Sequence, residues 1–111
     1  MVVLKEYLDI IGYFGYRNQM KKLNEECYEF LEAVDNYEDC MMILNSDERS
    51  GDMVLARDFV IEEMADMLIL LTQFIAKYNI NASEIDRHID VKLERTLERI
   101  GNGYYKKDDG N

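Results

Sequence analysis

Residues 23–34 read Leu-Asn-Glu-Glu-Cys-Tyr-Glu-Phe-Leu-Glu-Ala-Val, which is the pattern of an amphipathic helix. At about 100° per residue, its apolar side chains form one stripe: Leu23, Cys27, Phe30, Leu31 and Val34. Glu25 and Glu32 point away from this stripe, as solvated charges do. Glu26 lies on the shoulder of the stripe instead, and Glu29 follows one turn later. The sequence therefore predicts a pair of carboxylates beside the core face of this helix.

A second stretch repeats the arrangement. Residues 62–71 read Glu-Glu-Met-Ala-Asp-Met-Leu-Ile-Leu-Leu, with Glu63 and Asp66 on the shoulder and Glu62 pointing away. The expected core stripe of this helix consists of Val60, Met64, Met67, Leu68 and Leu71. From Met64 to Leu71 the helix is apolar nearly all round, which predicts a central helix buried on more than one side. A second copy of the chain would cover the surface that one small bundle leaves exposed.

The whole composition favours long helices. The chain has 111 residues, no proline and six glycines, which fits one domain of uninterrupted helices better than many short strands. We expect helices over residues 2–14, 18–34, 53–78 and 84–100, with Asn18 and Ser83 as N-caps of the second and fourth. Residues 45–52 read as a polar loop. The prediction is an all-α, four-helix-bundle type domain over residues 1–100, completed by dimerisation, with a flexible C-terminal tail over residues 101–111.

Charge and apolar runs limit the kinds of partner. A net charge of −10 argues against general binding to nucleic acid or to an anionic membrane, because both bind preferentially to positively charged surfaces. No apolar run approaches the roughly 20 residues that span a bilayer, and the N-terminus lacks the features of a signal peptide. Cys27 and Cys40 have apolar helical neighbours and are interpreted as reduced packing residues. We expect a cytoplasmic protein.

Four carboxylates on two helices predict a cation between them. Carboxylates near an apolar surface lose solvation and repel one another, and a divalent cation removes both penalties. Mg²⁺ prefers oxygen ligands, whereas zinc sites use His and Cys side chains, and neither type shares the shoulder with these four carboxylates. Either acidic pair alone would more often be a solvated helix face. Two pairs with the same angular offset favour a metal site that uses Glu26, Glu29, Glu63 and Asp66.

Basic side chains are the candidate contacts for phosphate. Lys92, Arg95 and Arg99 follow one side of the expected fourth helix and suit phosphate oxygens. They are equally compatible with a solvated flank that neutralises nearby acids. Lys22 shares a face with Glu26 and Glu29, so it either contacts phosphate or pairs with Glu26.

The motif Glu25-Glu26-x-x-Glu29, followed by Glu63-x-x-Asp66, resembles the signature of the MazG-like all-α nucleoside triphosphate pyrophosphohydrolases. This superfamily includes the dimeric dUTPases and phosphoribosyl-ATP pyrophosphatase, and the likeness covers roughly residues 16–100. The resemblance implies that Glu26, Glu29, Glu63 and Asp66 are the Mg²⁺ ligands. It also places Lys92 and Arg95 at positions that meet phosphate in relatives. The segment between the two half-motifs is longer here than in the most compact members.

The function implied by the resemblance is hydrolysis of the α–β phosphoanhydride of a nucleoside triphosphate, which gives a monophosphate and pyrophosphate. We expect a homodimer or homotetramer acting on a nucleotide. Phosphoribosyl-ATP is the alternative substrate. A non-catalytic helical interaction protein, whose apolar stripes bind a partner helix, is the alternative from a different class.

Overall fold

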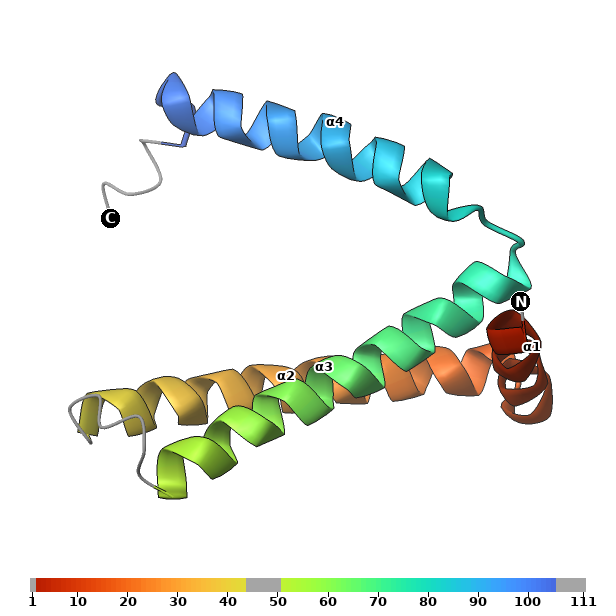
Figure 1. Cartoon of the computed structure of the whole chain (residues 1–111), viewed down its shortest axis with the longest axis horizontal. Helices are drawn as coiled ribbons and strands as arrows, with labels where there is room; N and C mark the ends of the chain where they lie inside the picture. The colour runs from red at the N-terminus through yellow and green to blue at the C-terminus, as the bar shows by residue number, and fades with distance from the viewer. Residues whose placement is uncertain (1, 44–50, 106–111) are drawn as a thin grey trace. The chain divides into compact units, whose positions relative to one another are not determined.

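The structure is a computed structural model that describes residues 2–43 and 51–105. These residues form four α-helices and, within the same ranges, no strand: α1 (Val2–Phe14), α2 (Tyr16–Ile43), α3 (Gly51–Lys77) and α4 (Ala82–Gly101) (Figure 1). The prediction of an all-α helical fold is confirmed. Most of the expected loop at 45–52, and residues 106–111 of the expected tail, lie outside the described residues.

Two expected N-caps are wrong. α2 begins at Tyr16, and the Asn18 side chain donates to the Phe14 carbonyl at 2.7 Å instead of capping. α4 is capped by Asn81, whose side chain accepts a hydrogen bond from the Ser83 amide while the Glu84 side chain accepts one from the Asn81 amide. This capping box satisfies two amides at once, which gives Asn81 the advantage over Ser83.

A single residue separates α1 from α2. Gly15 has a φ of +86°. This left-handed conformation is unfavourable for a residue that has a side chain, but not for glycine. Its amide donates to the Ile11 carbonyl at 2.8 Å, and its own carbonyl accepts from the Gln19 amide at 3.2 Å. The chain therefore turns sharply while its backbone remains hydrogen-bonded. Because no glycine or proline follows until Gly51, α2 continues without a break through Asp35 and Asn36.

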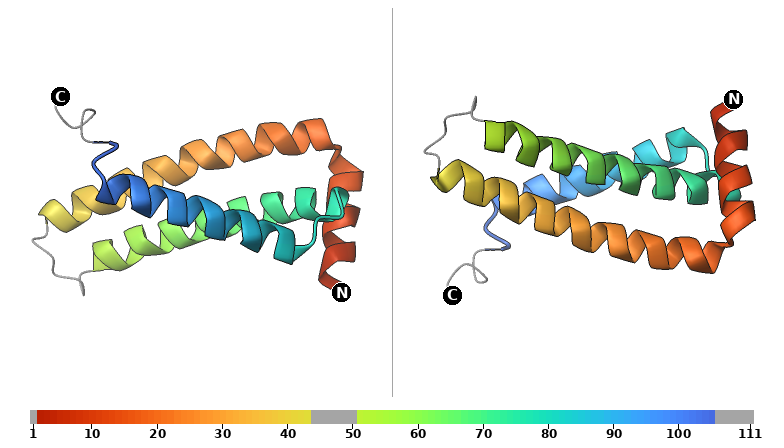
Figure 2. Two further views of the ribbon diagram at one scale, coloured as in Figure 1. Left: turned by 90° about the horizontal axis from the view of Figure 1, so that it is seen from above. Right: turned by 90° about the horizontal axis from the view of Figure 1, so that it is seen from below.

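The antiparallel helices α2 and α3 lie side by side (Figure 2) and share the most extensive contact in the described chain. On both helices, side chains of reduced exposure recur at alternating spacings of three and four, as in a coiled-coil seam. On α2 these residues are Gln19, Leu23, Glu26, Phe30, Ala33 and Tyr37. On α3 they are Met53, Ala56, Val60, Glu63, Met67 and Leu70, and Gln73 is buried against α2 three residues further on. α1 packs against both helices and buries Ile11.

The expected core stripe of α3 is partly wrong. Leu68 is 61% exposed, and Met64 and Leu71 are also exposed, whereas Leu70, which is not part of the expected stripe, is only 4% exposed. The reason is that α3 carries apolar side chains on several faces. Periodicity then identifies a buried helix but does not select the face that meets α2.

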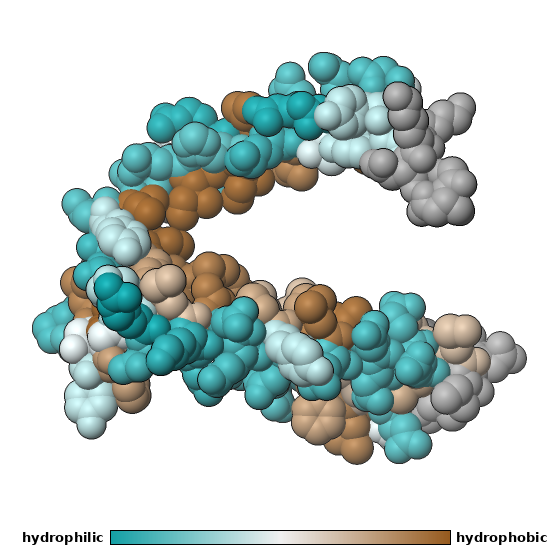
Figure 3. Space-filling model, turned by 180° about the vertical axis from the view of Figure 1, so that it is seen from behind, coloured by the Kyte–Doolittle hydropathy of each residue, from teal (hydrophilic) through white to brown (hydrophobic). Residues whose placement is uncertain are grey.

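The contacts divide the chain into an N-terminal unit, Met1–Tyr78, and a C-terminal unit, Asn79–Asn111. Taken by itself, α4 is amphipathic, with apolar side chains along one side and charged side chains along the other (Figure 3). The domain over residues 1–100 stays a prediction. Among the described residues, no helix is both long enough and apolar enough to cross a membrane.

Candidate functional site

Glu26 and Glu63 stand in the α2–α3 seam rather than on its shoulder. Glu26 is 4% exposed and Glu63 is half-buried, while Glu29 and Asp66, one turn along each helix, are exposed. Glu26, Glu29 and Glu63 each offer one carboxylate oxygen, and these three oxygens lie within 4.8 Å of one another. The structure therefore brings together three of the four carboxylates predicted as ligands, from two helices. Asp66 lies close enough to Glu26 to affect its ionisation.

Two oxygens in this carboxylate cluster are buried without a hydrogen-bond partner. They are Oε2 of Glu26 and Oε2 of Glu63. A carboxylate oxygen can only accept, so two ionised groups facing each other cannot satisfy one another. A buried polar atom without a partner costs about 1–3 kcal/mol. The cluster therefore requires either a proton or a cation.

One proton shared between the two glutamates meets this requirement. The hydrogen bond to Glu26 raises the pKa of Glu63 to about 7, and burial and the charge of Glu26 act in the same direction. Burial alone would raise the pKa of Glu26, but hydrogen bonds from Glu63 and Lys22 outweigh it, so the pKa of Glu26 is lowered. The two carboxyls therefore titrate as a coupled pair, and the directions of the two pKa shifts favour the shared proton on the Glu63 side.

The other two carboxylates are affected by the same charge. The Glu26 charge, followed by burial, raises the pKa of Glu29. Burial, followed by the Glu26 charge, raises the pKa of Asp66. Negative charge at Glu26 therefore opposes ionisation of its three acidic neighbours.

Lys22 is the cation nearest to the buried carboxylate. Its Nζ lies 3.2 Å from Glu26 Oε1, one turn back along α2, and this hydrogen bond raises the pKa of Lys22. The Lys22 side chain is 55% exposed, so the ammonium group reaches the cluster from solvent. The pairing of Lys22 with Glu26, one of the two expected roles of this lysine, is present. Contact with phosphate stays a prediction.

A pocket of about 220 Å³ adjoins the carboxylate cluster on the side away from Glu29. Lys22, Glu26 and Asp66 line one part of this pocket, and Gln19 and Gln73 line another. Gln19 Nε2 donates to Gln73 Oε1 at 2.9 Å across the α2–α3 seam. Sequence reasoning missed both glutamines. Gln19 lies four residues before Leu23, so the helical spacing of the apolar stripe could have identified it as a residue that faces α3.

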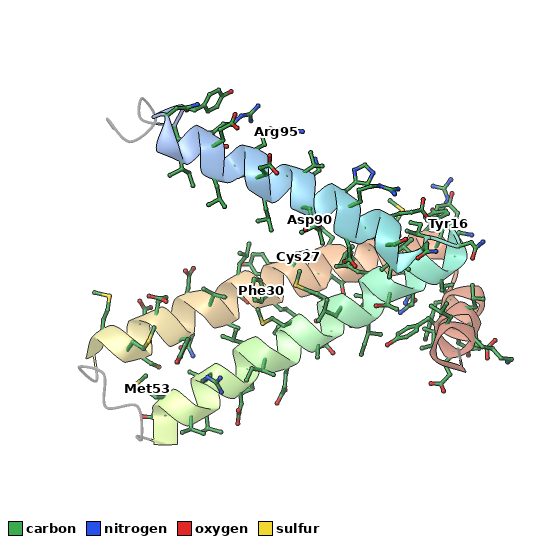
Figure 4. All side chains as sticks on the ribbon, turned by 45° about the horizontal axis from the view of Figure 1, so that its top comes forward. Tyr16, Cys27, Phe30, Met53, Asp90 and Arg95 are labelled. Atoms are coloured by element: carbon green, nitrogen blue, oxygen red, sulfur yellow. The ribbon has the colours of Figure 1, made fainter. Side chains whose placement is uncertain are left out.

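The remaining predicted residues are exposed. Arg95 (Figure 4) and Lys92 are exposed on α4, in the C-terminal unit, and the contact of both side chains with phosphate stays a prediction. Glu25 and Glu62 are exposed, as the helical wheel predicted. Cys27 and Phe30, which flank the acidic positions on α2, are half-buried. The candidate site is therefore the carboxylate cluster, Lys22 and the adjoining pocket.

The shared proton predicts how stability depends on pH. The pKa of Glu63 is about 7 in the folded chain against 4.5 ordinarily, so the folded chain binds more protons than the unfolded chain between these values. The free energy of unfolding without metal should therefore fall as pH rises from about 4.5 to 7 and level off above. The raised pKa values of Glu29 and Asp66 act in the same direction. The lowered pKa of Glu26 matters only below about 4.5, where it destabilises the fold as pH falls.

Glu63→Gln should weaken this pH dependence, because an amide donates to Glu26 without titrating. At about pH 8 the variant should be roughly 1–3 kcal/mol more stable than the wild type. Denaturant unfolding with a chelator at about pH 5.5 and about pH 8 measures both quantities. Glu62→Gln, at the exposed neighbouring position, is the control and should keep the wild-type dependence. A wild-type chain that gains stability between these two pH values would contradict the shared proton.

Comparison of the chain with protein-family models, with curated proteins and with solved structures finds no match. What the carboxylate cluster does must therefore follow from its geometry and from the motif that its residues form.

Proposed function

We propose that this protein is a Mg²⁺-dependent nucleotide pyrophosphohydrolase, which cleaves the α–β phosphoanhydride of a nucleoside triphosphate. The observation that carries the proposal is the convergence of Glu26, Glu29 and Glu63, whose oxygens lie within 4.8 Å of one another. Two facing glutamates do not stabilise the packing of two helices, because their carboxylates repel each other and are poorly solvated in the seam. A site for a divalent cation accounts for their position.

The donor set fits Mg²⁺. Every candidate ligand is a carboxylate oxygen, and a hard cation with several waters commonly binds through a few such oxygens. The two buried Oε2 atoms of Glu26 and Glu63 lack hydrogen-bond partners, so they are available to a cation. Glu26, Glu29 and Glu63 would hold the ion, and Asp66 completes the set that the motif implies. When bound, Mg²⁺ supplies charge neutralisation of phosphate oxygens and orientation of an attacking water.

The chain's own residues prepare the site for a charged ligand. The pKa of Glu63 is about 7, so near neutral pH this carboxyl carries its proton in about half of the molecules while the cluster is free of cations, and the proton can leave when a cation binds. Lys22 pairs with Glu26 at 3.2 Å from an exposed position. Once Glu26 is engaged by another cation, the Lys22 ammonium is free to donate to a phosphate oxygen. The burial of Glu26 keeps bulk water from its carboxylate.

Two further observations support a nucleotide as the substrate. The sequence Glu25-Glu26-x-x-Glu29 with Glu63-x-x-Asp66 resembles the MazG-like signature; Glu26, Glu29 and Glu63 converge, and Asp66 lies close enough to Glu26 to interact with it. The net charge of −10 disfavours a bare polyanion, whereas an anion that binds with its metal suits an acidic site. Lys92 and Arg95 on α4 are the proposed phosphate contacts beyond Lys22.

We also infer that the active form is a homodimer or homotetramer. Large apolar side chains are exposed on α2 and α3, including Leu31, Phe59 and Leu68. Apolar surface on two neighbouring helices is the usual mark of an interface. Sedimentation of the full chain should give the mass of two or more copies, and a monomer at about 10 µM, a concentration far above the dissociation constant of a stable dimer, would contradict this inference.

The activity prediction concerns release of pyrophosphate. Purified protein should release pyrophosphate from at least one member of a panel of standard and modified nucleoside triphosphates and phosphoribosyl-ATP, only when Mg²⁺ is present. Glu63→Gln should lower kcat/KM by about 100-fold or more, because it removes a charged ligand from the centre of the cluster. Glu62→Gln should stay within about threefold of the wild type, an effect below 1 kcal/mol.

Two results would contradict the proposal. One is an absence of Mg²⁺-dependent turnover across the whole panel at high enzyme concentration. The other is wild-type turnover by Glu63→Gln. Circular dichroism of both variants separates loss of the site from loss of the fold, because Gln at either position is compatible with a helix.

A further inference from the structure

A pair of buried amides lies beside the carboxylate cluster. Gln73 is 2% exposed and Gln19 is 7% exposed, and the single hydrogen bond between them is 2.9 Å long. An apolar pair would fill the same seam position without the cost of burying two amides. Both glutamines line the pocket of about 220 Å³. Their placement therefore suits a polar group that enters this pocket.

The amide pair retains hydrogen-bonding capacity. A primary amide has two N–H donors and an oxygen with two lone pairs. The Gln19–Gln73 bond uses one N–H of Gln19 and one lone pair of Gln73. A ligand at these side chains can thus meet donors and acceptors together, which is the requirement for reading the mixed edge of a heterocyclic base.

The lining residues of the pocket change in charge along the antiparallel helix pair. Glu26 and Asp66 line it toward the carboxylate cluster, where a phosphate is favoured only when it brings a cation. Gln19 and Gln73 line it one to two turns further along α2 and α3. Lys22 lies between them on α2, and its ammonium group is paired with Glu26. A neutral polar group therefore fits beside the two amides better than a bare phosphate does.

Shape and polarity narrow the ligand further. Ile69 and Leu70 add apolar surface beside the two amides. Flat apolar walls with a few polar groups at the edge are the usual environment of a planar ring. The pocket is smaller than the roughly 300–1,000 Å³ of sites that enclose a whole drug-sized ligand. It therefore suits one part of a nucleotide, with the phosphates extending over the carboxylate cluster.

We infer that the Gln19–Gln73 pocket holds the nucleobase of the substrate and that these two amides determine base specificity. The inference rests on the proposed function, since it assigns the base of the same nucleotide. Gln19 and Gln73 read donors and acceptors on the base edge, while Ile69 and Leu70 contact the ring. A base with the wrong pattern leaves a buried amide group unsatisfied, and such mismatches give strong discrimination.

Side-chain amide NMR tests the inference directly, because Gln19 and Gln73 are the only glutamines in the chain. Protein labelled with ¹⁵N at the glutamine side chains should show two amide groups. These are titrated with the common nucleosides, with ribose 5-phosphate and with pyrophosphate, all without metal. At least one nucleoside should shift both amide groups, and neither phosphate compound should do so.

A double variant gives the second readout. Gln19→Met with Gln73→Met removes both partners together, which avoids the unsatisfied amide that either single change would leave. The ratio of kcat/KM between the best and worst bases should fall by about tenfold or more, while Mg²⁺ still binds with an affinity within about threefold of the wild type. Asn24→Met, at an exposed position on α2, is the control and should leave the ratio unchanged.

The two proposals fail in different ways. If nucleosides shift the glutamine signals but no nucleoside triphosphate is hydrolysed, the proposed pyrophosphohydrolase activity is contradicted and the base pocket is supported. Hydrolysis with glutamine shifts caused by pyrophosphate rather than by nucleosides would overturn the base pocket alone. Absence of any shift at millimolar nucleoside, or an unchanged base ratio in a folded double variant, would also overturn it.

Discussion

Glu26 and Glu63 meet in the seam between α2 and α3, at positions where a helix pair ordinarily packs apolar side chains. Each has a buried Oε2 without a hydrogen-bond partner, and their carboxylate oxygens, with one from Glu29, lie within 4.8 Å of one another. Two ionised carboxylates at this separation repel in an environment that solvates them poorly. The seam tolerates them only with a proton or a cation.

The surrounding structure holds this cluster in place. The apolar layers on both sides of it, with Phe30 and Val60 on one side and Leu23 and Met67 on the other, fix the register of α2 against α3. The left-handed Gly15 turns the chain so that α1 packs against α3 and buries Ile11. The next polar layer is the Gln19–Gln73 pair, which lies on the same seam and lines the adjoining pocket. Charge and hydrogen-bonding capacity thus occupy neighbouring layers of one helix pair.

Sequence reasoning predicted the helices well and their faces less well. The absence of proline and the helical spacing of apolar residues identified α1, α3 and α4 to within two residues at each end. The ends of the helices depended on local hydrogen bonds. Asn81, rather than Ser83, is the N-cap of α4 because Glu84 completes a capping box with it. The four acidic positions were found from their spacing, but Glu26 and Glu63 were placed on a shoulder rather than in the seam. A helix as apolar as α3 offers several possible core faces, and only the partner helix selects one. The Gln19–Gln73 bond joins residues 54 positions apart, so no local pattern could reveal it.

The most direct test of the central claim is calorimetric titration of Mg²⁺ into the metal-free protein at about pH 7. Measured in two buffers of different ionisation enthalpy, it counts the protons that leave as the ion binds. The shared proton of Glu26 and Glu63 predicts binding with release of about half a proton per cluster at this pH, rising toward one at lower pH, because the pKa of Glu63 is about 7. Glu63→Gln should release almost none and bind more weakly. Absence of Mg²⁺ binding at millimolar concentration, or binding without proton release at any pH between about 5.5 and 7, would contradict the account.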